Sequence, residues 1–307
     1  MIIASIDIGT NTVLLLVAEV DPVTKNIVSL ENRYMLPRIG KDLKPGMPIS
    51  QDKISILTEI LTEYKMIADI YKCEHIIATA TNAFRIASNS GKIVSYVKKK
   101  LNINIEIIRG EDEAIFSFLG ASGNYPSGGN NLVIDIGGGS TEIVYGFEDK
   151  FLYKKSFGIG AVSATESILH HAPALPEELK RLDYKINYVF NELKYEKFNI
   201  QKAIAIAGTP TTLACIKMNL KYFDEGLIEG SIITFSELKE LVENLISLTP
   251  EQILLNFKDI VKGRQDILLS GSYILLKLSK LLNLDKVFVS TKGLRYGAVV
   301  NYINKLF

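Results

Sequence analysis

DIGTNT (7–12) and DIGGGST (135–141) are the two stretches that decide the fold. Each follows an apolar run that is typical of a strand, IIASID (2–7) or NLVIDI (131–136), and each leads into another, VLLLVAEV (13–20) or TEIVYGF (141–147). A unit made of a strand, an Asp-x-Gly turn and a second strand therefore occurs twice. Such an internal repeat indicates a duplicated domain.

Along the rest of the chain, short apolar runs alternate with longer amphipathic ones, which is the pattern of an α/β fold. Further strands are expected at 75–80, 103–109, 202–207 and 286–290, and helices at 51–71, 111–122, 161–171, 176–194, 236–246, 264–282 and 293–305. The segment 36–50 contains three prolines and is expected to be a loop. A domain boundary is expected near 110–130, where the Gly-, Ser- and Asn-rich stretch 120–131 begins.

The composition is that of an ordinary globular protein. The chain has 307 residues, of which 47% are hydrophobic and 22% charged, and its formal net charge is +1. A general DNA or RNA binder usually has a basic excess, so this charge argues against one. Cys73 and Cys215 are too few for a disulfide framework and lack zinc-ligand spacing. With neither a secretory signal nor an apolar stretch long enough to span a membrane, we expect a cytoplasmic protein.

The glycine turn of the second repeat is a candidate phosphate site. Successive glycines let the backbone approach an anion closely and point several N–H groups at it, although a tight hairpin uses glycines as well. The related turn of the first repeat favours the phosphate interpretation. We therefore expect both turns to bind phosphate, through Gly9, Thr10, Asn11, Thr12, Gly137, Gly138, Gly139, Ser140 and Thr141. Asp7 and Asp135 precede the turns and could hold Mg²⁺, a hard cation that prefers carboxylate oxygens.

Three further segments place charged or small residues after an expected strand. Glu113 lies in an acidic helix start that could simply complement the helix dipole, but a carboxylate there could also deprotonate water. Arg85 ends ATATNAFR (78–85), and a guanidinium beside a phosphate can neutralise developing charge. Gly208 and Thr209, in AIAGTPTTLA (205–214), could offer backbone N–H groups to an anion at a helix start.

Together these segments resemble the exopolyphosphatase/guanosine pentaphosphate phosphohydrolase (Ppx/GppA) family, a branch of the actin-like, sugar-kinase and heat-shock ATPase superfamily. The resemblance covers essentially the whole chain and rests on DIGTNT (7–12), TNAFR (81–85), GEDEA (110–114), DIGGGSTE (135–142), FGIGAV (157–162), AGTPTT (207–212), GRQDILLSG (263–271) and GLRYG (293–297). We expect a short form, without the C-terminal HD-like domain of longer relatives. Many relatives have a histidine where this chain has Glu229.

The resemblance implies two ribonuclease-H-like lobes, 1–115 with 293–307 and 116–292, with a cleft between them. By motif position Glu113 matches the catalytic base, Arg85 the phosphate-binding arginine, and Asp135 the aspartate that positions metal or water. Glu142 matches a cleft-lining acid, which we expect to join Asp7 and Asp135 as a metal ligand. Basic cleft residues are expected among Arg38, Lys41, Lys44, Arg264, Lys292 and Arg295.

The implied function is Mg²⁺-dependent release of terminal phosphate from inorganic polyphosphate, from pppGpp, or from both. Two alternatives stay open: an ATP-dependent kinase or ATPase of the same superfamily, and a sensor that binds polyphosphate or (p)ppGpp without turnover. No DNA, RNA or membrane partner is expected. The sequence leaves open whether the protein forms a homodimer.

Overall fold

The computed structural model describes residues 1–307 apart from 22, 25, 124–128, 149 and 307. The chain divides into two units: Met1–Gly120 with Leu294–Phe307 form unit 1, and Ala121–Gly293 form unit 2. The boundaries expected from the sequence, after residues 115 and 292, fall slightly earlier. Part of the stretch expected at the boundary, 124–128, lies outside the described residues.

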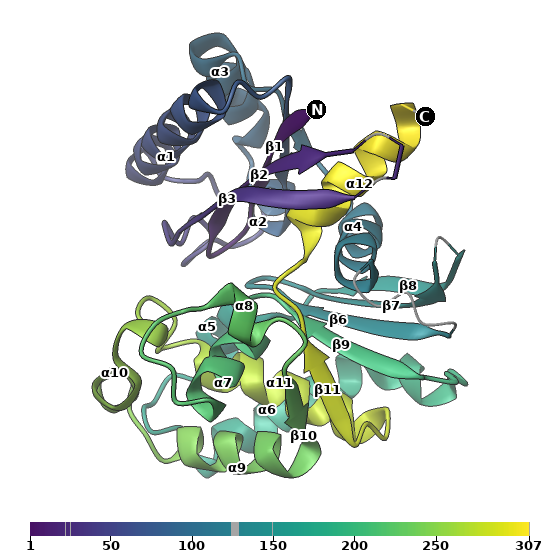
Figure 1. Cartoon of the computed structure of the whole chain (residues 1–307). Coiled ribbons are helices and arrows are strands. Elements are labelled where there is room, and N and C mark those ends of the chain that lie inside the picture. Colours follow the sequence, from purple (N-terminus) through teal and green to yellow (C-terminus); the bar gives the residue numbers. More distant parts are fainter. Residues whose placement is uncertain (22, 25, 124–128, 149, 307) are drawn as a thin grey trace. The chain divides into compact units, whose positions relative to one another are not determined.

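Unit 1 is built on one mixed sheet. In its described part the strand order is β3-β2-β1-β4-β5, and β1 pairs antiparallel with β2 and parallel with β4. Figure 1 labels β1, β2 and β3 of this sheet. The strands are β1 (Ile2–Ile8), β2 (Val13–Val20), β3 (Ile27–Met35), β4 (His75–Ala80) and β5 (Ile105–Ile107). The helices are α1 (Gln51–Ile70), α2 (Asn82–Ile86), α3 (Ser90–Leu101), α4 (Gly110–Ser122) and α12 (Leu294–Leu306).

Both faces of this sheet are covered, because alternate residues of a strand point to opposite faces. Ile6 and Ile8 of β1 pack with Leu61 and Tyr64 of α1 in one buried cluster. Ile3, on the other face, packs in a second cluster to which α12 contributes Tyr296, Val299 and Ile303. The C-terminal segment, which follows unit 2 in the chain, is thus part of the core of unit 1.

Unit 2 repeats this plan with one added strand. In its described part the strand order is β10-β11-β9-β6-β7-β8. The strands are β6 (Asn131–Ile136), β7 (Thr141–Phe147), β8 (Lys150–Phe157), β9 (Lys202–Ile206), β10 (Ile232–Thr234) and β11 (Lys286–Val289). The helices are α5 (Ala161–Ile168), α6 (Pro176–Val189), α7 (Gly208–Lys217), α8 (Glu225–Ile228), α9 (Phe235–Ile246), α10 (Pro250–Phe257) and α11 (Leu268–Leu281), with 3₁₀ turns at Asn191–Tyr195 and Lys258–Ile260.

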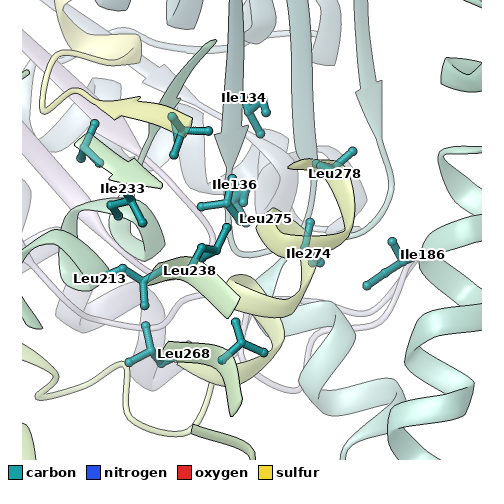
Figure 2. Close-up of a cluster of buried hydrophobic side chains, with 14 of the residues drawn as sticks. Ile134, Ile136, Ile186, Leu213, Ile233, Leu238, Leu268, Ile274, Leu275 and Leu278 are labelled. Carbon is teal, nitrogen blue, oxygen red and sulfur yellow. The ribbon is translucent and has the colours of Figure 1, made fainter. Parts of the chain in front are cut away.

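The core of unit 2 lies between its sheet and the helices. Ile134 and Ile136 of β6 pack in one buried cluster with Leu213 of α7 and with Leu275 and Leu278 of α11 (Figure 2). The run β8-β7-β6-β9-β11 has the same order and the same strand directions as β3-β2-β1-β4-β5. This correspondence confirms the duplicated domain and the α/β class expected from the sequence.

Several expected elements need correction. The strand expected at 103–109 is shorter, the helix expected at 161–171 ends at Ile168, and the helix expected at 264–282 begins at Leu268. The helix expected at 176–194 gives way to a 3₁₀ turn after Val189. The strands β3, β8 and β10 were not expected. In the part of the chain that the structure describes, no helix is long and apolar enough to cross a membrane.

Candidate active site

In each sheet the candidate site residues lie where the parallel strands end, at what we call the strand-end edge. In unit 1 the parallel strands β1, β4 and β5 end together, since Thr81 N–H donates to Ile8 O (3.1 Å) and Ile108 N–H to Ala80 O (3.0 Å). The DIGTNT turn, the α2 segment with Arg85 and the start of α4 with Glu113 follow these strand ends. In open α/β sheets, ligands bind at the carboxyl ends of the parallel strands.

Unit 2 has the equivalent edge after β6, β9 and β11. The glycine turn 137–140, the start of α7 and the segment 290–292 follow these strands, and Ser290 N–H donates to Ala205 O (3.1 Å). Each predicted site residue therefore belongs to one of two corresponding edges, one in each unit.

The two turns close in the same way. Gly9 N–H donates to Thr12 O (2.9 Å), and Gly137 N–H donates to Ser140 O (3.0 Å). A Cβ on Gly9 would lie 3.0 Å from Thr12 O, and one on Gly137 would lie 3.1 Å from Ser140 O. The first glycine of each turn therefore allows the backbone to approach closely. The two turns correspond in their backbone hydrogen bonds as well as in their sequences.

Helix α5 holds the glycine turn of unit 2 in place through backbone hydrogen bonds. The Gly137 carbonyl accepts from Ala161 N–H (2.9 Å), and the Gly138 carbonyl accepts from Val162 (2.8 Å) and Ser163 (3.0 Å). These bonds occupy the turn's carbonyl groups. Among the described residues, by contrast, the backbone N–H groups of Gly138, Gly139 and Ser140 have no acceptor. The turn thus presents donors, which is what an anion requires.

Thr141 departs from the expected phosphate role. Its side chain is fully buried, and its hydroxyl donates to Ile159 O at 2.7 Å. The hydroxyl is engaged in holding the segment before α5, so the donors of this turn come from the three residues before Thr141.

Asp135 and Glu142 form a carboxylate pair. They lie directly opposite each other on β6 and β7, and both are at least nine-tenths buried. Glu142 Oε1 also accepts from Ser156 Oγ of β8 at 2.6 Å. Two like charges placed opposite each other in a ladder repel, so the pair favours a cation between or beside the two groups.

The donor chemistry of this pair fits Mg²⁺. Mg²⁺ takes oxygen ligands and is commonly held by one or two carboxylates, with water and substrate phosphate completing its shell. Among the described residues, no group of three or more His, Cys, Asp and Glu side chains converges on one metal position. Asp7, in the equivalent position of β1, faces Leu14 rather than an acid, so unit 1 offers one carboxylate where unit 2 offers two.

The start of α7 is the third element of the unit 2 edge. Ala207, just before it, has φ +76°, a region that non-glycine residues rarely adopt. Thr209 is 6% exposed, and its hydroxyl has no hydrogen bond among the described residues. Two residues of the GRQDILLSG segment pack closely against this turn: a Cβ on Gly208 would lie 2.3 Å from Arg264 Nη1, and a Cβ on Gly271 would lie 2.3 Å from Thr209 Oγ1. Arg264, one of the expected basic residues, therefore lies at this helix start.

Arg85 and Glu113 meet in unit 1. Arg85 Nη1 lies 2.6 Å from Glu113 Oε2, and it also donates to Ile108 O at 3.1 Å. The Glu113 side chain is 10% exposed and that of Arg85 is 21% exposed. The adjacent guanidinium favours the carboxylate form of Glu113, which is the form that can accept a proton, and the contact fixes the orientation of the side chain.

Arg295 and Glu229 have internal partners. Arg295 is 8% exposed, and its Nη1 donates to Leu15 O (3.3 Å) in unit 1. Glu229 accepts from the Ser290 hydroxyl (2.9 Å) and from the Thr291 backbone N–H (2.7 Å). Glu229 thus holds the segment after β11. Glu229 directly follows α8, and the sequence around it carries no signal for this contact.

The comparisons with known proteins decide the family. The model of the Ppx/GppA phosphatase family matches residues 16–306, nearly the whole chain. The chain belongs to the Ppx/GppA phosphatase family. This membership confirms the resemblance and, with it, the expected enzyme class.

The relatives that the chain matches differ in length. The chain is 27% identical to Exopolyphosphatase 2 of Mycobacterium tuberculosis over 97% of the chain and 98% of that protein. It is 30% identical to a bifunctional 3-dehydroquinate synthase/phosphatase of Fusobacterium nucleatum, but spans only 46% of that protein.

Solved Ppx/GppA structures match the fold across the whole chain. The Aquifex aeolicus family member has a TM-score of 0.85 at 29% identity, covering 100% of this chain and 98% of that one. An exopolyphosphatase from Cytophaga hutchinsonii has a TM-score of 0.90 at 25% identity, covering 99% and 98%. The actin-like fold class expected from the sequence is thereby confirmed.

Proposed function

We propose that the protein is a Mg²⁺-dependent phosphoanhydride hydrolase that releases terminal phosphate from inorganic polyphosphate, from pppGpp, or from both. The observation that carries the proposal is the contact between Arg85 and Glu113, at the strand-end edge that also bears the DIGTNT turn. Both side chains lie at this edge, and by motif position they match the catalytic base and the phosphate-binding arginine of the family. The names of two relatives support these two substrates: Exopolyphosphatase 2, and the guanosine-5'-triphosphate,3'-diphosphate pyrophosphatase of Aeromonas hydrophila, which is 24% identical over 96% of this chain and 58% of that protein.

In the proposed reaction a water oxygen attacks the terminal phosphorus in line with the anhydride bond. Glu113 accepts the water proton, the P–O bond to the leaving chain breaks, and the products are inorganic phosphate and a chain shorter by one unit. Arg85 neutralises charge that spreads over the phosphoryl oxygens. The glycine turn of unit 2 has its own donors for phosphate oxygens, the backbone N–H groups of Gly138, Gly139 and Ser140.

Asp135 and Glu142 would hold the magnesium ion. When bound, Mg²⁺ supplies positive charge to phosphate oxygens. The hydrogen bond from Ser156 fixes one oxygen of Glu142, so the geometry of the carboxylate pair is set before any ion arrives.

The cellular setting is part of the proposal. A cytoplasmic location agrees with the state of the cysteines, since Cys73 and Cys215 are not paired in a disulfide. Burial raises the pKa of the Cys215 thiol to about 11, so this thiol is protonated at neutral pH. Nearly balanced charge argues against a nucleic-acid partner. Activity on pppGpp would connect the protein to the stringent response.

The test is phosphate release from medium-chain polyphosphate and from pppGpp, measured side by side with Mg²⁺ and with a chelator. We expect release that depends on Mg²⁺ from at least one substrate. Release from polyphosphate alone would define an exopolyphosphatase. A folded protein that releases phosphate from neither would overturn the proposal, and phosphate transfer from ATP to an acceptor would then favour a kinase.

A further inference from the structure

The guanidinium of Arg85 is divided into two parts by its contacts. Nη1 has two hydrogens, and both are used, one for Ile108 O and one for Glu113 Oε2. Nε and Nη2 carry the other three hydrogens, and they have no acceptor among the described residues. One nitrogen is thus committed to the protein, while the rest of the group is available.

The available part has the geometry of an anion site. In a planar guanidinium, Nε–H and one Nη2–H point in parallel and match two oxygens of one phosphate. The Arg85 side chain is 21% exposed, so these hydrogens are not sealed in the core. Because these donors are accessible and have no acceptor among the described residues, an anion can bind them without displacing a protein group.

We infer that Arg85 holds Glu113 and a substrate phosphate at the same time, through two different edges of one guanidinium. This inference rests on the proposed function and deepens it. Arg85 then has a positioning role besides charge neutralisation. The rigid plane sets the distance between Glu113, which takes the proton, and the phosphorus that the water attacks, and placement at this level controls rate.

The competing arrangement is an exchange, in which phosphate displaces Glu113 from Arg85. Exchange would break a 2.6 Å contact whose carboxylate is nine-tenths buried. The free edge makes that unnecessary, because Nε and Nη2 can bind the anion while Nη1 keeps both of its partners.

Arg85→Lys separates the two tasks. A lysine ammonium keeps the positive charge, but it is a point donor and cannot hold both partners in a fixed plane. We expect kcat to fall about 100-fold and KM for polyphosphate to stay within about threefold. Arg109→Lys is the matched control, because Arg109 pairs with Asp112 and its side chain is 80% exposed. We expect this control to match the wild type. An unchanged kcat for folded Arg85→Lys, or a rise in KM alone, would overturn the inference.

Binding of inorganic phosphate, measured by calorimetry, tests the same inference without turnover. Glu113→Gln removes a negative charge and should tighten phosphate binding in any arrangement, so its effect is compared in the wild-type and Arg85→Ala backgrounds. If Arg85 holds Glu113 and phosphate simultaneously, Glu113→Gln should increase phosphate affinity in the wild-type background by no more than it does in the Arg85→Ala background. A gain about tenfold larger with Arg85 would show exchange and overturn the inference. If the wild type hydrolyses neither substrate but passes this test, the proposed function fails and the inference stands.

Discussion

Gly160, at the start of α5, gives the sharpest test of how the glycine turn is held. A Cβ on Gly160 would lie 2.6 Å from Gly137 O and 2.7 Å from both the carbonyl carbon and the oxygen of Gly138. Its own backbone, with φ −147° and ψ −177°, suits any residue, so Gly160→Ala introduces a clash and no other strain. The atoms in the way are backbone atoms of the candidate phosphate turn itself.

The size of the effect follows from these distances. To reach ordinary van der Waals contact, the turn must move away from α5 by about half an ångström or more. That movement stretches the three bonds from Ala161, Val162 and Ser163, which are now 2.8–3.0 Å long. Overpacking of this kind costs about 1–3 kcal/mol of stability. Because a shift of about 1 Å can cost 100-fold in rate, we expect kcat to fall about tenfold or more.

Gly158→Ala is the matched control, two residues earlier in the same segment. A Cβ on Gly158 meets nothing within 4 Å, and the residue is exposed. Denaturant unfolding and polyphosphate hydrolysis would be measured for both variants. We expect Gly158→Ala to behave as wild type. Wild-type stability and kcat in Gly160→Ala would refute the idea that α5 fixes the turn.

Three further predictions concern stability. Gly297→Ala should destabilise the protein by about 3 kcal/mol or more in urea unfolding, because its Cβ would lie 1.7 Å from Phe116 O of α4. Gly91→Ala is the control: its Cβ meets open space, so it should stabilise the protein by about 0.5 kcal/mol. Equal effects of the two substitutions on stability would contradict the close approach of Gly297 to α4. Thr141→Val should cost about 1–3 kcal/mol by the same assay, since it leaves the buried Ile159 carbonyl without its donor, and a neutral effect would contradict it. Hydrogen bonds from the His171 ring and then from the Leu175 and His170 N–H groups lower the pKa of Glu178 from 4.5 to about 2. Because the pKa of Glu178 is lower in the folded than in the unfolded protein, its contribution to folding stability is complete above about pH 4.5 and is lost as the pH falls toward 2. The difference in melting temperature between wild type and Glu178→Gln should therefore shrink over that pH range. A difference that stays constant would contradict the assignment.

The central strands could be predicted because their sequences are unambiguous. Val13–Val20, His75–Ala80, Asn131–Ile136 and Thr141–Phe147 have the expected bounds, and all are apolar runs ended by turn residues. The strands β3 and β8 were missed because they lie at sheet edges. Their sequences, IVSLENRYM and KFLYKKSF, mix charged and apolar residues without strict alternation. An edge strand pairs with one neighbouring strand and is partly exposed, so its sequence shows only a weak alternation of buried apolar and exposed polar residues.

The candidate site was predicted in parts. The two turns, Arg85 and Glu113 could be found because small or charged residues directly follow apolar runs, and the ends of parallel strands meet at one edge. The pairing of Arg85 with Glu113 could not be found, since the two residues lie on separate elements. The glycines that pack against the turns could not be predicted either. Gly160 and Gly271 matter because a Cβ at either position would clash with a turn, and such close packing leaves no hydrophobic pattern in the sequence.

The most direct test of the account is the turnover number of Glu113→Gln on the substrate that the wild type hydrolyses. The matched control is Glu111→Gln, which removes an exposed acid from the same turn of α4. We predict that Glu113→Gln folds and binds substrate but loses about 10²- to 10⁴-fold in kcat, while Glu111→Gln keeps wild-type turnover. A folded Glu113→Gln protein with wild-type kcat would remove the proposed base and contradict the account.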